Sequence, residues 1–97
     1  MSFVQIIEYK TSKADEMNKL LDEFLEKTTG RRSSLTGWLC ADRDSSGTYV
    51  NVVRFPSYEE AMRNSELPET GEMAEKMAEL CDGPVVFRNL DLIREDS

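Results

Sequence analysis

The segment from Trp38 to Phe55 holds the residues that are best suited to binding and activating a small organic molecule. It contains an indole (Trp38), a phenol (Tyr49), a carboxamide (Asn51) and a phenyl ring (Phe55). Aromatic walls with a few polar groups are typical of small-molecule pockets. Asn51 interrupts an apolar strand, where an amide without a partner costs about 1–3 kcal/mol. It therefore needs a hydrogen-bond partner.

Two interpretations of Asn51 are open. In the first, its amide donates a hydrogen bond to a ligand oxygen on which negative charge develops, and Trp38, Tyr49 and Phe55 hold the ligand's rings. In the second, Asn51 is a satisfied core amide that is bonded to water or to a neighbour such as Gln5 or Asp42. Tyr49 carries a labile hydroxyl, but the ordinary phenol pKa of about 10 makes it a poor base.

The chain contains no histidine. This excludes Ser–His and Cys–His nucleophile pairs and histidine-ligated metal or haem sites. Two cysteines, Cys40 and Cys81, are too few for a disulfide framework or a zinc site, and we expect both to be buried and reduced. Acidic residues at 66, 69 and 72 are conceivable metal ligands, but the acidic start of a helix explains them more simply. We expect no metal and no cofactor.

The charge balance limits the partners. Acidic residues outnumber basic ones 19 to 12, for a net charge of -7, which argues against nucleic acid and anionic membranes. The adjacent pair Arg31-Arg32 is better explained as a solvated loop than as an anion site. No apolar run is long enough to span a membrane, and the N-terminus lacks the basic region of a signal peptide. We expect one cytoplasmic domain over residues 1–97.

Hydrophobic spacing and turn residues predict an α+β fold. The expected elements are a strand at 3–9, a helix from Ser12 to Thr28 that ends at Gly30, strands at 35–43 and 48–55, a helix capped by Ser57, a second helix through 73–81 after Pro68, and a strand at 85–93. This β-α-β-β-α-β order is ferredoxin-like, with an antiparallel sheet and helices on one face.

The strands are apolar on both faces, which predicts a homodimer. On the strand at 48–55, for example, Tyr49 and Val53 oppose Val50 and Val52. The helices suffice to cover one face, and soluble monomers avoid a large exposed apolar patch. A second copy packed face to face would cover the other face. The alternative is that loops or longer helices cover it.

The hairpin loop decides which residues share a face. If residues 44–47 form an even loop, Trp38 and Cys40 lie on the same face as Asn51 and Phe55. A three-residue loop would reverse this assignment. With the even loop, Trp38, Tyr49, Asn51 and Phe55 form one pocket wall.

The segment from Gly37-Trp38 through Arg54-Phe55-Pro56-Ser57-Tyr58-Glu59-Glu60-Ala61, together with the helix at 73–80, resembles the antibiotic biosynthesis monooxygenase (ABM) family. The resemblance implies a dimeric α+β barrel. Members that oxidise polycyclic phenols use neither metal nor flavin, because the substrate carbanion itself reacts with dioxygen. Asn51 matches the family's strand Asn, whereas Phe55 stands in the place of a Trp and Ala74 in that of an Arg. Haem-degrading relatives use a His, which this chain lacks.

Two functions follow from these observations. The first is a cofactor-independent monooxygenase, or an isomerase-like relative, that acts on a small aromatic or polyketide-type molecule, with Asn51 as the catalytic residue and Trp38, Tyr49 and Phe55 as substrate-binding residues. The second is a non-catalytic homodimer that binds a small molecule or serves as a scaffold. Fold alone does not decide between them.

Overall fold

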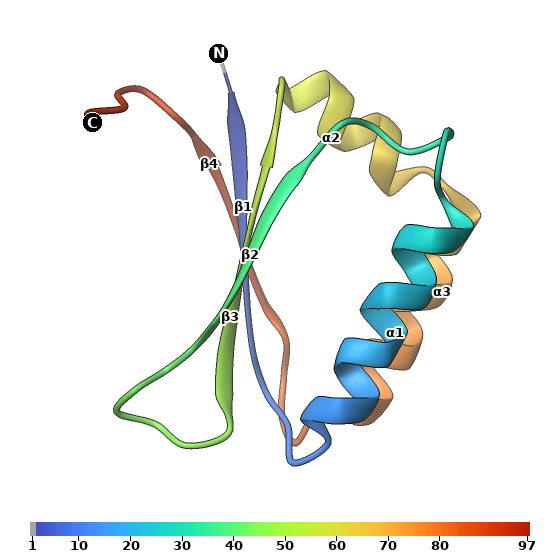
Figure 1. Ribbon diagram of the computed structural model, residues 1–97, viewed down its shortest axis with the longest axis vertical. Coiled ribbons are helices and arrows are strands. Elements are labelled where there is room, and N and C mark those ends of the chain that lie inside the picture. Colours follow the sequence, from blue (N-terminus) through green and yellow to red (C-terminus); the bar gives the residue numbers. More distant parts are fainter. Residues whose placement is uncertain (1) are drawn as a thin grey trace.

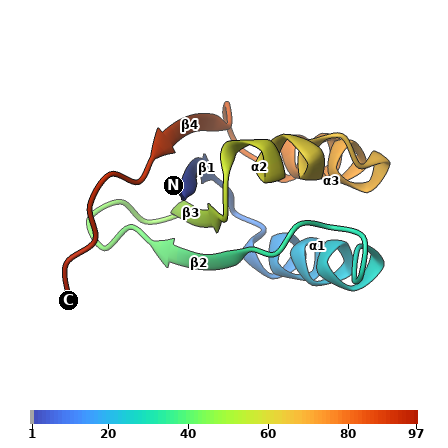
Figure 2. The ribbon, with the colours of Figure 1, turned by 90° about the horizontal axis from the view of Figure 1, so that it is seen from above.

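The computed structural model describes residues 2–97 and confirms the α+β class and the predicted order of strands and helices. The elements are β1 (Phe3–Lys10), α1 (Ala14–Lys27), β2 (Thr36–Ala41), β3 (Thr48–Phe55), α2 (Tyr58–Ser65), α3 (Pro68–Leu80) and β4 (Val86–Asp91). The four strands form one antiparallel sheet in the order β2-β3-β1-β4. All three helices lie on one face of this sheet, with α1 beside α3 (Figures 1 and 2).

The hydrophobic core is divided into two clusters at opposite ends of β1. At the end near Tyr9, the buried residues are Ile7, Tyr9, Met17 and Met77. At the end near Phe3, they are Phe3, Phe55 and Ala61. The helices therefore contact the sheet through two separate sets of apolar side chains, and the middle of the sheet lies between these sets.

The start of α1 differs from the sequence prediction. The N-cap residue is Lys13 rather than Ser12, and no side chain caps the helix. The hydroxyl that serves this turn belongs to Thr11, whose Oγ1 accepts a hydrogen bond from Lys13 N at 2.9 Å and donates one to Leu80 O at 2.6 Å. A buried Thr11 thus ties the end of β1 to the end of α3. Beyond the other end of α1, Gly30 has a φ of 83°, a conformation that favours glycine.

The start of α2 confirms the predicted cap. Ser57 has an extended backbone, and its hydroxyl accepts a hydrogen bond from Glu60 N at 3.2 Å. We expect Ser57→Ala to lower the free energy of unfolding by about 0.5–2 kcal/mol, because the amide of Glu60 loses its partner. Ser65→Ala is the matched control. Among residues 2–97 the exposed Ser65 hydroxyl bonds only Met62 O, so its loss should change stability by less than about 0.5 kcal/mol. Urea unfolding of both variants would test this, and equal effects would contradict the capping role.

The face of the sheet opposite the helices is largely apolar and has no covering element among residues 2–97. We call it the outer face. Its apolar side chains are Val4, Ile6, Trp38, Cys40, Val50, Val52, Val86 and Leu90. Trp38 is 48% exposed, Val86 46% and Leu90 40%. Cys40, which we expected to be buried, is exposed because it lies on this uncovered face.

Within residues 2–97, none of the helices combines the length and the apolar character that crossing a membrane would require. The tail that follows β4 begins with a backbone hydrogen bond from Leu92 N to Ser2 O at 2.9 Å. It then passes the end of β3, where Glu95 forms an ion pair with Arg54 at 3.1 Å. Arg54 also lies over the ring of Trp38, with its Cζ 5.9 Å from the ring centroid.

Candidate ligand cavity

A cavity of about 590 Å³ separates the helices from the middle of the sheet, between the two core clusters. Its sheet wall comes from β1, β2, β3 and β4, and its helical walls from α1, α2 and α3. The lining residues are Gln5, Ile7, Asn18, Leu21, Asp22, Phe24, Leu25, Leu35, Gly37, Leu39, Asn51, Val53, Phe55, Asn64, Thr70, Met73, Ala74, Met77 and Phe87. A volume of this size lies within the range of small-molecule sites, about 300–1,000 Å³.

The chemistry of the cavity wall favours an uncharged, largely apolar ligand. Asp22 is the one charged residue among the described residues that line the cavity. The other polar groups are amides and one hydroxyl, from Gln5, Asn18, Asn51, Asn64 and Thr70. An anionic ligand would find no cation on these walls, and transferring a charge into such surroundings is costly. The apolar side chains supply the contact surface, and the amides can fix the orientation of the ligand.

Asn51 lies in the sheet wall, at the centre of β3. It is half-buried, with Ile7 of β1 on one side and Leu39 of β2 on the other. The two neighbours that the sequence suggested as partners each make one hydrogen bond to another group. Gln5 Nε2 donates to Asn89 Oδ1 at 3.2 Å, and Asp42 Oδ1 accepts from Asp44 N at 2.9 Å. Because Asn51 lines the cavity, its amide can form a hydrogen bond with a molecule bound there.

The structure brings together two of the four sequence-predicted site residues. Asn51 and Phe55 both line the cavity. Trp38 lies on the outer face of the sheet, so its predicted place in this pocket wall is wrong. The reason is the hairpin loop, because Asp42 N bonds Thr48 O and leaves an odd number of residues, 43–47, between them. An odd loop places Leu39 opposite Asn51 and turns Trp38 to the other face.

Tyr49 shares a face with Asn51 but lies in the core cluster beside the cavity. Its ring stacks on that of Tyr9, with the ring centroids 5.9 Å apart, and it packs against the cluster that contains Met17 and Met77. Burial raises the pKa of Tyr9, and the nearby Cys81 and Tyr49 raise it further. Burial likewise raises the pKa of the half-buried Cys81 thiol. Tyr9 and Cys81 therefore stay neutral near pH 7, and the cluster forms a structural end to the cavity.

Sequence reasoning did not single out the polar residues of the helical walls, although their spacing carries a signal. Asn18 and Asp22 lie one turn apart on α1, next to Leu21 and Leu25 of its apolar stripe, and all four line the cavity. Asn64 follows the buried Ala61 by three residues and lies on the same buried side of α2. In each case, a polar residue at a helical position that otherwise carries apolar residues could have indicated a cavity-lining side chain.

The position that carries an Arg in the resembling family also lies at the cavity. Ala74 of α3 lines it, together with Asn51 and Phe55. The three positions that match the polar residues of the resembling family therefore line the same cavity. In this chain they carry one amide, one phenyl ring and one methyl group. The cavity thus retains a hydrogen-bonding group on the sheet and has apolar contacts at the other two positions.

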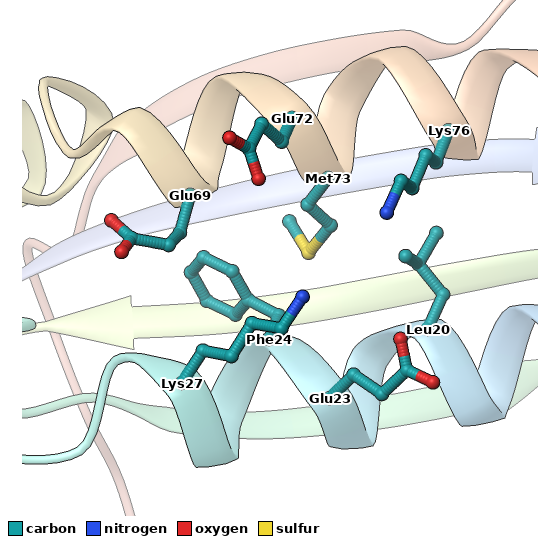
Figure 3. Close-up of a pocket in the computed structure, with 8 residues that line it drawn as sticks. All are labelled: Leu20, Glu23, Phe24, Lys27, Glu69, Glu72, Met73 and Lys76. Atoms are coloured by element: carbon teal, nitrogen blue, oxygen red, sulfur yellow. The ribbon is translucent and has the colours of Figure 1, made fainter.

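A second depression, on the outer side of the helices, is too small to hold an organic ligand. It has a volume of about 20 Å³, enough for one water molecule. Figure 3 shows Phe24 and Met73 between α1 and α3, with charged side chains around them. Glu69 borders this groove and pairs with Arg31, whose hydrogen bond lowers the pKa of the carboxyl group. The pairing accounts for Arg31 without a bound anion.

Comparisons with known proteins identify the fold. No family model and no curated protein matches this sequence. Among solved structures, a Caulobacter crescentus protein assigned as an antibiotic biosynthesis monooxygenase superposes with a TM-score of 0.81 at 16% identity, covering 96% of this chain and 91% of that one. Rv0793 from Mycobacterium tuberculosis gives 0.79 at 19% identity, with full coverage of both chains (100% and 100%). SnoaB, a cofactor-independent oxygenase from Streptomyces nogalater, gives 0.79 at 12% identity, covering 97% and 95%.

These likenesses extend over nearly the whole chain, although the sequences have diverged widely. They agree with the strand order, the antiparallel pairing and the position of the helices described above. The chain therefore has the ferredoxin-like α+β fold of the antibiotic biosynthesis monooxygenases.

Proposed function

We propose that this protein is a cofactor-independent monooxygenase that oxidises a small, uncharged aromatic or polyketide-type molecule in the cavity. The observation that carries the proposal is the amide of Asn51, which stands in the apolar sheet wall while its polar neighbours are bonded elsewhere. An amide N–H in an apolar site stabilises a developing oxyanion more strongly than it would in water. Phe55 and Val53 on the same strand contact the face or edge of the ring.

The proposed reaction takes its electrons from the substrate. An enolisable ring carbon of the type R₂CH₂ gives a proton to water, and the resulting enolate combines with dioxygen to give the peroxide anion R₂CH–OO⁻. This anion takes a proton back from solvent and becomes the hydroperoxide, R₂CH–OOH. Loss of water then gives the ketone, so that R₂CH₂ and O₂ become R₂C=O and H₂O. Asn51 Nδ2 donates to the enolate oxygen, which lowers the cost of removing the proton. No residue of the chain changes its oxidation state.

We further propose that the protein works as a homodimer in which two outer faces pack together. Trp38, Val50, Val52 and Leu90 make this face apolar, and such patches on soluble proteins mark association sites. A two-fold arrangement lets the same patch cover itself. The partner would cover Trp38, Cys40 and Val86 and leave the cavity, on the other face of the sheet, open to substrate.

Oxidation of anthrone would test the proposed activity, since its enol form is a polycyclic phenol. We expect the protein to accelerate anthraquinone formation over the protein-free reaction, with one dioxygen consumed per anthrone, and we expect EDTA to have no effect. The absorbance of the quinone and an oxygen electrode give the two readings. Equal rates with and without protein, for anthrone and for other enolisable phenols, would contradict the proposal.

The second candidate is a non-catalytic homodimer that binds a small molecule. It is favoured by Phe55 and Ala74, which put apolar groups where the resembling family has a Trp and an Arg. Native mass spectrometry of the purified protein, combined with the anthrone assay, separates the two functions. A dimer that retains a small molecule but does not accelerate anthrone oxidation would support binding alone.

A further inference from the structure

We propose that Asp22 is the base of the proposed reaction. Its carboxylate bonds the water molecule that receives the proton from the substrate carbon, and it takes a proton from that water. This inference rests on the proposed function, because it takes the cavity as the site of the oxidation. It adds the proton acceptor to the role proposed for Asn51. Neither the resemblance nor the predicted site residues included Asp22.

The cavity wall offers one side chain that can act as a base. The other polar residues that line the cavity carry amides and one hydroxyl, which are poor proton acceptors. The chain has no histidine, and Tyr9 and Tyr49 belong to the neighbouring core cluster. Among the described lining residues, only Asp22 carries a carboxylate. A positioned side chain of this kind accelerates proton transfer, either directly or through one water molecule.

The carboxylate of Asp22 is free to bind water. It lies on α1, it is exposed, and it borders the cavity. None of the ion pairs that form among residues 2–97 includes Asp22. A carboxylate without a protein partner keeps its hydration, so a water molecule bonded to it stands at the cavity wall. This water can receive the proton of a bound substrate.

Asp22 and Asn51 line the same half of the cavity. Figure 2 shows α1 on the side of the sheet where β2 lies, and α3 on the side of β4. Asn51 is in β3, directly beside Leu39 of β2. In anthrone, the ketone and the reactive methylene lie at opposite edges of the central ring. When the ketone oxygen bonds Asn51 on the sheet wall, the methylene therefore points away from the sheet, toward the helical side where α1 carries Asp22.

The proton transfer balances without a cofactor. The methylene carbon gives its proton to the bound water, and the same water gives a proton to the Asp22 carboxylate, which becomes a carboxylic acid. The electron pair of the C–H bond moves into the enolate, whose oxygen accepts a hydrogen bond from Asn51. Because Asp22 is exposed, its carboxylic acid returns the proton to solvent, and the peroxide anion takes a proton from solvent in turn.

Hydrogen exchange at the anthrone methylene tests the base separately from the reaction with dioxygen. In D₂O without dioxygen, we expect the wild-type protein to accelerate the loss of the methylene proton signal over the protein-free rate. Asp22→Asn keeps the size of the side chain but removes the base. It should therefore slow this exchange, and lower kcat for anthraquinone formation in the presence of dioxygen, each by about 10²-fold.

Rescue by formate distinguishes a base from a structural carboxylate. Asp22→Ala should lose as much activity as Asp22→Asn, but it leaves a space at the cavity wall. Formate supplies a carboxylate to that space, so it should raise the rate of Asp22→Ala by about tenfold or more and approach saturation. The wild-type protein and Asp22→Asn should not respond, because the side chain still occupies the space.

Glu26→Ala is the matched control, because Glu26 is an exposed acid one turn further along α1 and is not among the residues that line the cavity. It should keep wild-type rates, and circular dichroism verifies that each variant is folded. If Asp22→Asn reacts at the wild-type rate, or if formate fails to restore Asp22→Ala, the role of Asp22 is overturned while the monooxygenase stands. If the wild-type protein accelerates neither exchange nor oxidation, the proposed function fails, and the role of Asp22 fails with it.

Discussion

Asn51→Leu should lower kcat for oxidation of an enolisable phenol by about 10²–10³-fold, which corresponds to about 2.7–4 kcal/mol of lost transition-state stabilisation. The substitution keeps a side chain of similar size in the sheet wall but removes the N–H donor. The donor matters most when negative charge gathers on the substrate oxygen, so the change should fall on kcat more than on KM. Initial rates of quinone formation over a range of anthrone concentrations would separate the two constants.

The same variant should be at least as stable as the wild-type protein. Asn51 lies in an apolar wall without help from Gln5 or Asp42, and replacing such an amide by a hydrocarbon can raise the free energy of unfolding by about 1 kcal/mol. If the variant is more stable but inactive, the amide of Asn51 has a functional rather than a structural role. Loss of activity together with loss of stability would instead indicate a structural amide.

Gln5→Leu is the control for Asn51→Leu. Gln5 also lines the cavity from the sheet, but its amide is already bonded to Asn89 on the exposed edge. Its removal should change kcat by less than about tenfold, because the proposed oxyanion does not contact it. If Gln5→Leu is the more damaging substitution, or if Asn51→Leu keeps full activity, the proposed role of Asn51 is wrong.

Fold class and element order could be predicted because they depend on local patterns. The apolar, β-branched run of β1, the apolar stripe of α1 and the Ser57 cap each have a signature within one segment. The start of α1 was misplaced by one residue because Thr11, which bonds the distant Leu80 O, replaces the local Ser12 cap. A partner 69 residues away in the sequence leaves no local signal.

Which residues line the cavity could be predicted only in part. The assignment depends on whether the hairpin loop between β2 and β3 has an odd or an even number of residues. Placing Trp38 beside Asn51 required an even loop, and the 43–47 loop is odd. One residue of loop length moves every side chain of β2 to the opposite face. Asn64 was missed for a different reason, since a single polar residue on a short helix has meaning only once the helix is known to border a cavity.

The outer face leads to the second prediction with a large expected effect. We expect the wild-type protein to have about twice the 11.1 kDa mass of the chain in solution, and Val52→Glu to have the mass of one chain. Val52 lies in the middle of the outer face, opposite Ile6 on one side and Trp38 on the other. A two-fold interface would bury two copies of the introduced carboxylate, each of which costs several kcal/mol when it has no partner. The dissociation constant should therefore rise by at least about a thousandfold.

Val52→Thr separates the effect of the charge from that of the strand. Threonine keeps the branched side chain that suits a β-strand, so this variant should remain a dimer with slightly weaker association. Sedimentation velocity over a range of protein concentrations gives the masses, and circular dichroism shows whether Val52→Glu is still folded. A monomeric wild-type protein would contradict the dimer. A dimeric Val52→Glu would place the interface elsewhere and leave the exposed Trp38, with Arg54 over its ring, as a surface feature of the single chain.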